Sequence, residues 1–119
     1  MTSILDSIKK LLGISDDDTQ FDTDIIIHIN TVFSILTQLG VGPEEGFSIS
    51  DKTTTWSDFI DNATDIEMVK TYVYLRVRLL FDPPQSSFAI EAIKESFKEI
   101  EYRMYVLKDN ERISEGDGN

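Results

Sequence analysis

Acid–base chemistry in this chain would depend on its single histidine, His28. Histidine is a common general acid or base near neutral pH, but catalysis also needs a nucleophile or substrate within hydrogen-bond reach. His28 lies in an isoleucine-rich run, and the sequence has no Gly-x-Ser-x-Gly motif to supply a nucleophile. We therefore interpret His28 as a structural or surface residue and predict that the protein is not an enzyme.

A cluster of carboxylates is a candidate metal site, because Ca²⁺ and Mg²⁺ prefer oxygen ligands. The cluster consists of Asp16, Asp17, Asp18, Asp22 and Asp24. A helix–loop–helix calcium site needs a glycine at its sixth position and a glutamate at its twelfth. Counted from Asp16, those positions hold Phe21 and Ile27. We expect no metal site and interpret these acids as solvated groups near a helix start.

Two further motifs could bind an anion. Glycines around Pro43 superficially resemble a phosphate loop, but no Lys-Ser or Lys-Thr pair follows, and Glu44 and Glu45 would repel phosphate. Arg76 and Arg78 lie in a predicted core helix, where arginines commonly pair with acids or extend their charged ends into solvent. We predict no cofactor, and we keep both arginines as candidate protein-interface residues.

Aromatic and apolar side chains exceed what a small helical core requires, and surplus aromatics are typical of protein interfaces. With the two arginines, the candidate interface residues are Phe47, Ile49, Trp56, Phe59, Tyr102 and Tyr105. For Trp56 and Phe59 an alternative stays open, in which they only fix a loop to the core.

The charge is strongly acidic, with 22 acidic and 11 basic residues and a net charge of −11. Such a surface repels nucleic acid and anionic lipid. Residues 1–67 carry 13 acids and 3 bases, whereas residues 68–108 carry 5 acids and 7 bases. This asymmetry suits head-to-tail association of identical subunits. An uneven solvated surface explains it equally well.

The sequence contains no cysteine, which excludes disulfides and thiolate metal sites and is compatible with a reducing cytosol. No stretch approaches the ~18 consecutive apolar residues that a membrane span needs. We therefore predict an intracellular protein with no membrane contact.

Helical spacing of apolar residues predicts the elements that position these groups. The first predicted helix covers residues 3–12, is capped by Thr2 or Ser3 and is stopped by Gly13. The second is capped by Asp22-Thr23-Asp24, ends at Leu39, and has a predicted core face of Ile25, Ile26, Ile29, Val32, Phe33, Leu36 and Leu39. The third is a central helix that is capped by Asp65, ends at Phe81 and carries apolar residues on nearly every side. The fourth runs from Ser86 or Ser87 to residue 108 and carries a heptad-like apolar stripe of Ala89, Ile93, Phe97, Ile100, Met104 and Leu107. The long loop 40–64 is expected to contain one helical turn at Trp56–Ile60.

These elements predict a mainly α fold, a small bundle of about four helices with a long loop and a short helical turn between the second and third. One domain spans residues 1–108, with residues 1–13 as a possible docking arm. Residues 109–119 are predicted to be a flexible acidic tail.

Three strings carry a resemblance to a known family. They are FDTDIIIHINTVFSILTQLGVGP at 21–43, Trp56-Ser57-Asp58-Phe59, and VKTYVYLRVRLLFDPP at 69–84, which is followed by a serine-capped amphipathic helix. In these features the chain resembles the head–tail connector family of tailed bacteriophages, small helical adaptor or head-completion proteins, over nearly all of residues 1–108. The matching strings are structural, so no single residue role is carried over.

The resemblance implies a structural virion protein that docks under the phage portal as part of a ring. The ring is expected to be twelvefold, to contact the portal and neck or tail-completion proteins, and to let DNA pass as cargo through its channel. Such a protein would lie in the virion neck after assembly in the bacterial host cytoplasm.

An acidic mimic of DNA that inhibits a host DNA-binding protein is the alternative. It rests on the net charge and on acids at positions 16–18, 22, 24, 58, 61, 65 and 67. It would require these carboxylates to form an array like that of duplex phosphates.

Overall fold

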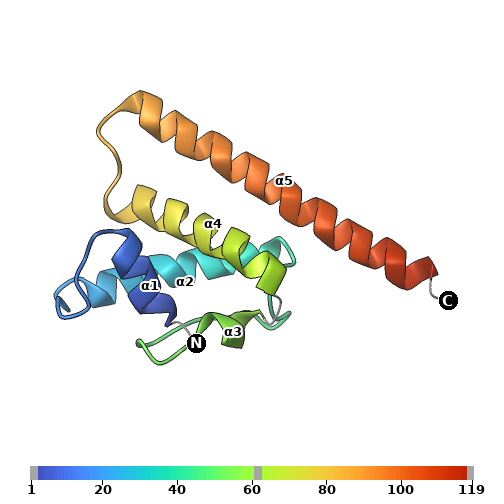
Figure 1. Cartoon of the computed structure of the whole chain (residues 1–119), viewed down its shortest axis with the longest axis horizontal. Helices are drawn as coiled ribbons and strands as arrows, with labels where there is room; N and C mark the ends of the chain where they lie inside the picture. Colours follow the sequence, from blue (N-terminus) through green and yellow to red (C-terminus); the bar gives the residue numbers. More distant parts are fainter. Residues whose placement is uncertain (1–2, 61–62, 118–119) are drawn as a thin grey trace.

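The computed structural model describes residues 3–60 and 63–117, and over these residues the chain forms five helices and no strand (Figure 1). They are α1 (Ile4–Leu11), α2 (Asp22–Gln38), the short α3 (Trp56–Phe59), α4 (Ala63–Phe81) and α5 (Ser87–Asp117). The predicted mainly α bundle, with a helical turn in the long loop, is confirmed.

Helix α1 begins and ends at the residues that the sequence indicates. Ser3 is its N-cap, where the hydroxyl oxygen accepts a 3.2 Å hydrogen bond from the Asp6 N–H. The helix stops before Gly13, whose φ of 82° is left-handed and favours glycine. Ile4 and Ile8 are fully buried, so this short helix is stabilised by packing against α2 and α4.

Helix α2 begins at Asp22, and the expected side-chain cap from Asp22-Thr23-Asp24 is wrong. Phe21 is the N-cap residue and makes no side-chain cap hydrogen bond. Asp22 and Asp24 lie in the first turn, where the helix dipole favours negative charge. The Asp22 carboxylate instead lies 2.9 Å from the ammonium Nζ of Lys9, a side chain only 1% exposed, so it balances a buried charge on α1.

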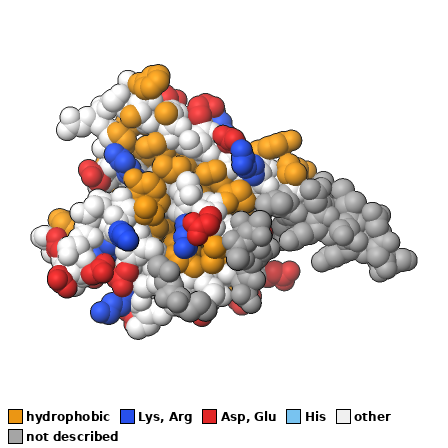
Figure 2. Space-filling model, viewed as in Figure 1, with side chains coloured by type: hydrophobic (Ala, Val, Ile, Leu, Met, Phe, Trp, Pro, Cys, Tyr) orange, Lys and Arg blue, Asp and Glu red, His pale blue; other side chains and the backbone are white. Residues whose placement is uncertain are grey.

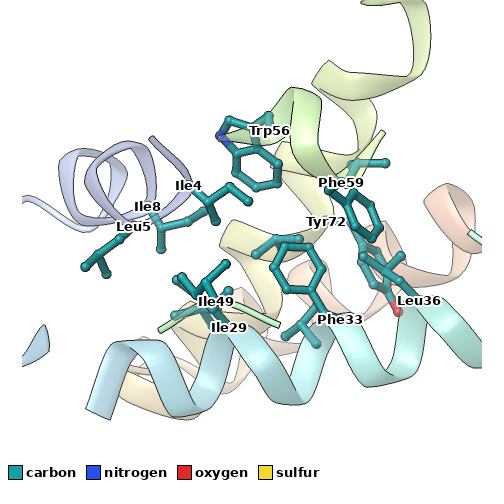
Figure 3. Packing of buried hydrophobic residues seen from close by; sticks show 14 of the residues in the cluster. Ile4, Leu5, Ile8, Ile29, Phe33, Leu36, Ile49, Trp56, Phe59 and Tyr72 are labelled. Atoms are coloured by element: carbon teal, nitrogen blue, oxygen red, sulfur yellow. The ribbon is translucent and has the colours of Figure 1, made fainter. Parts of the chain in front are cut away.

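The long loop is fixed to α2 by the side-chain amide of Asn30 and by aromatic rings packed against Phe33. Asn30 accepts a 2.7 Å hydrogen bond from the Ile49 N–H and donates one of 2.9 Å to the Ile49 carbonyl. The ring of Phe33 lies 5.1 Å from that of Phe47 and 4.7 Å from that of Phe59. Figure 3 shows Phe33, Ile49, Trp56 and Phe59 converging on the core between α1, α2 and α4.

Helix α4 is central, as predicted, because it packs against α1, α2 and α5. It starts at Ala63, two residues before the expected cap Asp65, which lies in its first turn instead. Val69, Tyr72, Val73 and Val77 are fully buried. The sequence predicts apolar residues on nearly every side of this helix. This agrees with the structure, in which α4 contacts three other helices.

Helix α5 runs along α4 and projects beyond the other helices (Figure 1). Phe97 and Met104 are buried against α4, while Ile93 and Ile100 are half-buried. These are members of the predicted heptad-like stripe. The helical backbone continues to Asp117, into the segment predicted to be a flexible tail. Residues 118–119 and the side chains from 107 onward lie outside the described residues, so flexibility there stays a prediction.

Candidate assembly surface

The loop residues proposed as interface contacts lie in the core. Ile49, Trp56 and Phe59 are 2–4% exposed, and Phe47 is half-buried against Phe33. Their side chains are covered by α1, α2 and α4, so within this chain they present little surface to a partner. The alternative left open for Trp56 and Phe59, that they fix the loop to the core, is the one that the structure favours.

Arg76 joins α4 to α5 through a hydrogen-bonded network. Its Nε donates to the Tyr72 hydroxyl at 2.7 Å, and its Nη2 lies 2.9 Å from the Glu101 carboxylate. The Tyr72 hydroxyl in turn donates to Glu101 at 2.5 Å. The guanidinium also lies over the ring of Phe97, 4.6 Å from its centroid. Arg76 therefore has partners within the chain, as the pairing interpretation of this arginine expects.

The network changes the ionisation of its members. Burial, together with the hydrogen bond to Glu101, raises the pKa of Tyr72 to about 12. Burial alone would raise the pKa of Glu101, but the hydrogen bonds from Tyr72 and Arg76 outweigh it, and the pKa of Glu101 is lowered. The network therefore favours an ionised Glu101 facing Arg76, which holds α5 against the body.

Arg78 has a weaker local partner, since its Nη1 donates to the Tyr74 hydroxyl at 3.1 Å. Among the described side chains of residues 68–106, every other basic group has an acidic partner. These pairs are Lys70–Glu67, Arg76–Glu101, Lys94–Glu91, Lys98–Glu95 and Arg103–Glu99. The slightly cationic half of the sequence is thus neutralised locally and forms no unpaired basic face over these residues.

Tyr102 and Tyr105 are the candidate interface residues that lie outside the core. Their side chains are 68% and 65% exposed on α5. Phe88, near the start of the same helix, is 83% exposed. Residues 88, 95 and 102 are seven apart, and so are 91, 98 and 105, so all six share one face of α5. We call this face, with aromatic rings at both ends, the α5 ridge.

A second surface lies on α4, between α1 and α5. One hollow of about 730 Å³ is lined by α1 and α4, including Leu11 and Tyr74. Another, of about 390 Å³, is lined by α4 and α5, including Leu75 and Ile100. Both are bordered by Glu67 and Thr71, so they adjoin along α4, and together we call them the α4 trough.

Figure 2 shows hydrophobic side chains gathered in a band across the middle of one face, with acidic and basic groups around it. A contiguous apolar patch on a soluble domain marks a contact surface more often than scattered apolar residues do. The sequence could not identify the α4 trough, because its lining residues come mainly from three helices, and the apolar spacing does not determine how those helices pack together.

No cluster of metal ligands accompanies these surfaces among the described side chains. His28 is half-buried, with its ring 6.3 Å from that of Phe81. Among the described side chains, those of residues 3–60 and 65–106, no three or more His, Cys, Asp or Glu groups gather closely enough to hold a metal ion. None of the helices over those residues is long and apolar enough to cross a membrane.

Comparison with known proteins identifies a family for this chain. No curated protein and no solved structure matches the chain significantly. A family model described as "Phage connector protein" matches residues 4–111, which include all of α1 to α4 and most of α5. The match covers most of the chain and agrees with its helical architecture, so the chain belongs to the phage connector protein family.

Proposed function

We propose that this protein is a structural virion subunit of the head–tail connector, which docks under the portal as part of a ring. The observation that carries the proposal is the family match over residues 4–111. The family is one of structural proteins, which supports a role in assembly over a role in catalysis. The match lends no support to the alternative of an acidic DNA mimic.

Two features support a ring that DNA passes through. The net charge of −11 would repel DNA phosphates, and a channel wall should not retain its cargo. The α5 ridge and the α4 trough give each subunit two distinct contact surfaces, which is what association in a closed ring requires. A twelvefold ring, matched to the portal, is the arrangement that we propose for the virion neck, assembled in the host cytoplasm.

The proposal is tested by mixing the purified protein with the portal protein of the same phage. Cosedimentation and electron microscopy of the mixture should reveal a ring of this chain below the portal. A protein that remains monomeric and unbound to portal, from low to high salt, would contradict the proposal. Competition with DNA for a host DNA-binding protein would instead favour the mimic.

A further inference from the structure

We propose that the α5 ridge of one copy docks into the α4 trough of the next copy, and that this contact joins neighbouring subunits. The inference rests on the proposed function for the ring itself and goes beyond it by naming the two surfaces. Tyr102 and Tyr105 are the anchoring side chains on the ridge, and Leu11, Tyr74 and Leu75 line the trough that receives them.

Tyr105 lies on the side of α5 opposite to the side that lines the trough. Ser96 lines the trough, and Tyr105 lies nine residues further along α5, which is two and a half turns at 3.6 residues per turn. Tyr105 therefore points away from the trough of its own chain. A copy that uses its ridge on one neighbour keeps its trough free for another, so the contact is heterologous and can propagate around a ring.

The shape of α5 allows it to reach a neighbour. It is 31 residues long, and among the described helices it makes extensive contacts with α4 alone. Its C-terminal half projects beyond the body (Figure 1). Amphipathic helices commonly bind in grooves between other helices, with their apolar side chains as anchors. The trough between α1 and α5 offers such a groove.

Charge decides where two copies can meet. Each copy carries a net charge of −11, so acidic faces in contact would repel. The charged ridge residues and their paired neighbour Lys94 balance, with two acids and two lysines: Glu91, Lys94, Glu95 and Lys98. The charged lining of the trough is close to neutral, with four acids and three bases: Asp6, Asp16, Glu67, Glu99, Lys10, Lys70 and Arg103. These surfaces are therefore suited to contact between like-charged subunits.

Lys10 provides a positive charge in the trough that can attract an acidic segment of a neighbouring copy. It lines the trough and has no ion-pair partner among the described side chains. The sequence after Tyr105 carries the acids Asp109, Glu111, Glu115 and Asp117 against two bases, Lys108 and Arg112. We take the docked α5 to lie with its C-terminal end toward α1, so that this net acidic part of the sequence faces Lys10.

The test uses the absence of native cysteine, so that introduced thiols report only the intended contact. Thr71→Cys places a thiol in the trough, and Lys98→Cys places one on the ridge, four residues before Tyr102. Both are exposed, so neither change should unfold the protein. Mixed and oxidised in portal-bound rings, the two variants should form a disulfide-linked pair. The matched control mixes Lys98→Cys with Glu44→Cys, which alters an exposed residue outside both surfaces. This control mixture should form no disulfide-linked pair.

A second measurement uses the anchors themselves. Tyr102→Ala with Tyr105→Ala should weaken subunit association at least about tenfold, because exposed aromatic anchors commonly dominate interface energy. Leu39→Ala, which removes an exposed apolar side chain elsewhere, should leave association unchanged. Circular dichroism should give the same helix content for all of these variants.

The outcomes separate this inference from the proposed function. Rings that form on the portal without the Thr71–Lys98 crosslink, and that tolerate loss of both tyrosines, would overturn the contact while leaving the connector role in place. Rings that still form but no longer bind portal after the tyrosine changes would assign the ridge to the portal and also overturn it. Absence of any ring or portal complex in the unaltered protein would remove both proposals.

Discussion

The indole Nε1 of Trp56 donates a 2.7 Å hydrogen bond to the hydroxyl oxygen of Ser7, which lies 49 positions earlier in the chain. The Ser7 hydroxyl in turn donates to the Ser3 carbonyl at 2.8 Å, inside the first turn of α1. Because Trp56 is 2% exposed, its N–H has little access to water as a substitute partner. This pair fixes the long loop to α1.

We predict that Ser7→Ala lowers the free energy of unfolding by about 1–3 kcal/mol, since it leaves a buried indole donor unpaired. Trp56→Phe removes the donor, so Ser7→Ala should cost less in that background. Urea denaturation of the single and double variants measures this coupling. Ser34→Ala, on an exposed position of α2, is the control and should change stability little. Additive single effects would show that the bond contributes nothing.

The ion pair between Lys9 and Asp22 predicts unequal effects of removing its two members. The Lys9 side chain is 1% exposed, whereas that of Asp22 is 27% exposed. The two atoms lie 2.9 Å apart, although their geometry is not that of a hydrogen bond. Lys9 Nζ also donates to the Asp16 carbonyl at 3.3 Å.

Asp22→Ala should therefore lower the free energy of unfolding by about 3–5 kcal/mol, because it leaves a buried ammonium without its counter-charge. Lys9→Met should cost less, since the apolar stem is retained and the remaining carboxylate can be hydrated. Thermal and urea unfolding of both variants show which one loses more free energy of unfolding. Equal losses, or a larger loss for Lys9→Met, would mean that the stem packing of Lys9 outweighs the charge.

The lowered pKa of Glu101 predicts a loss of stability in acid. A carboxyl group whose pKa is lower in the folded state stabilises the fold above its unfolded pKa, about 4.5, and this contribution is lost as the pH falls through the folded value. Glu101→Gln should flatten the dependence of unfolding free energy on pH below about pH 5. Glu95→Gln removes an exposed, solvent-screened pair and should leave the profile nearly unchanged. Parallel profiles for the wild type and Glu101→Gln would refute this assignment.

The apolar spacing of α2 predicted its buried face well. Of its predicted members, Ile26 is half-buried, and Ile25, Ile29, Val32, Phe33 and Leu36 are fully buried, because successive turns of a regular helix repeat the same pattern. Leu39, assigned to the same face, is 40% exposed because the helix ends at Gln38. Burial of Lys9 had no signal in the sequence, since a lysine on a short amphipathic helix is ordinarily assigned to solvent.

The loop could not be divided into core and surface from sequence, because residues 40–60 follow no regular period. Phe47, Ile49, Trp56 and Phe59 were grouped with Tyr102 and Tyr105 by residue type alone. Only the packing of the loop on Phe33 and Asn30 separates the buried set from the exposed one. The exposure of the two tyrosines agrees with their lying outside the core, and their contact with a partner stays a prediction.

Gly42 and Gly13 form a matched pair for the last prediction. Both have a left-handed φ, 87° and 82°, which strains any residue with a Cβ. At Gly13 a Cβ would meet no atom within 4 Å, whereas at Gly42 it would lie 2.6 Å from Cζ of Phe59.

Gly13→Ala should therefore report the backbone strain alone, about 1–2 kcal/mol. Gly42→Ala should cost clearly more, because the ring of Phe59 is buried between Phe33 and Phe47 and cannot move without disturbing them. Adding Phe59→Leu should reduce the excess cost of Gly42→Ala but not the cost of Gly13→Ala. Chemical denaturation of the three single variants and the two double variants checks this, and equal costs at the two glycines would mean that the loop shifts freely around Phe59.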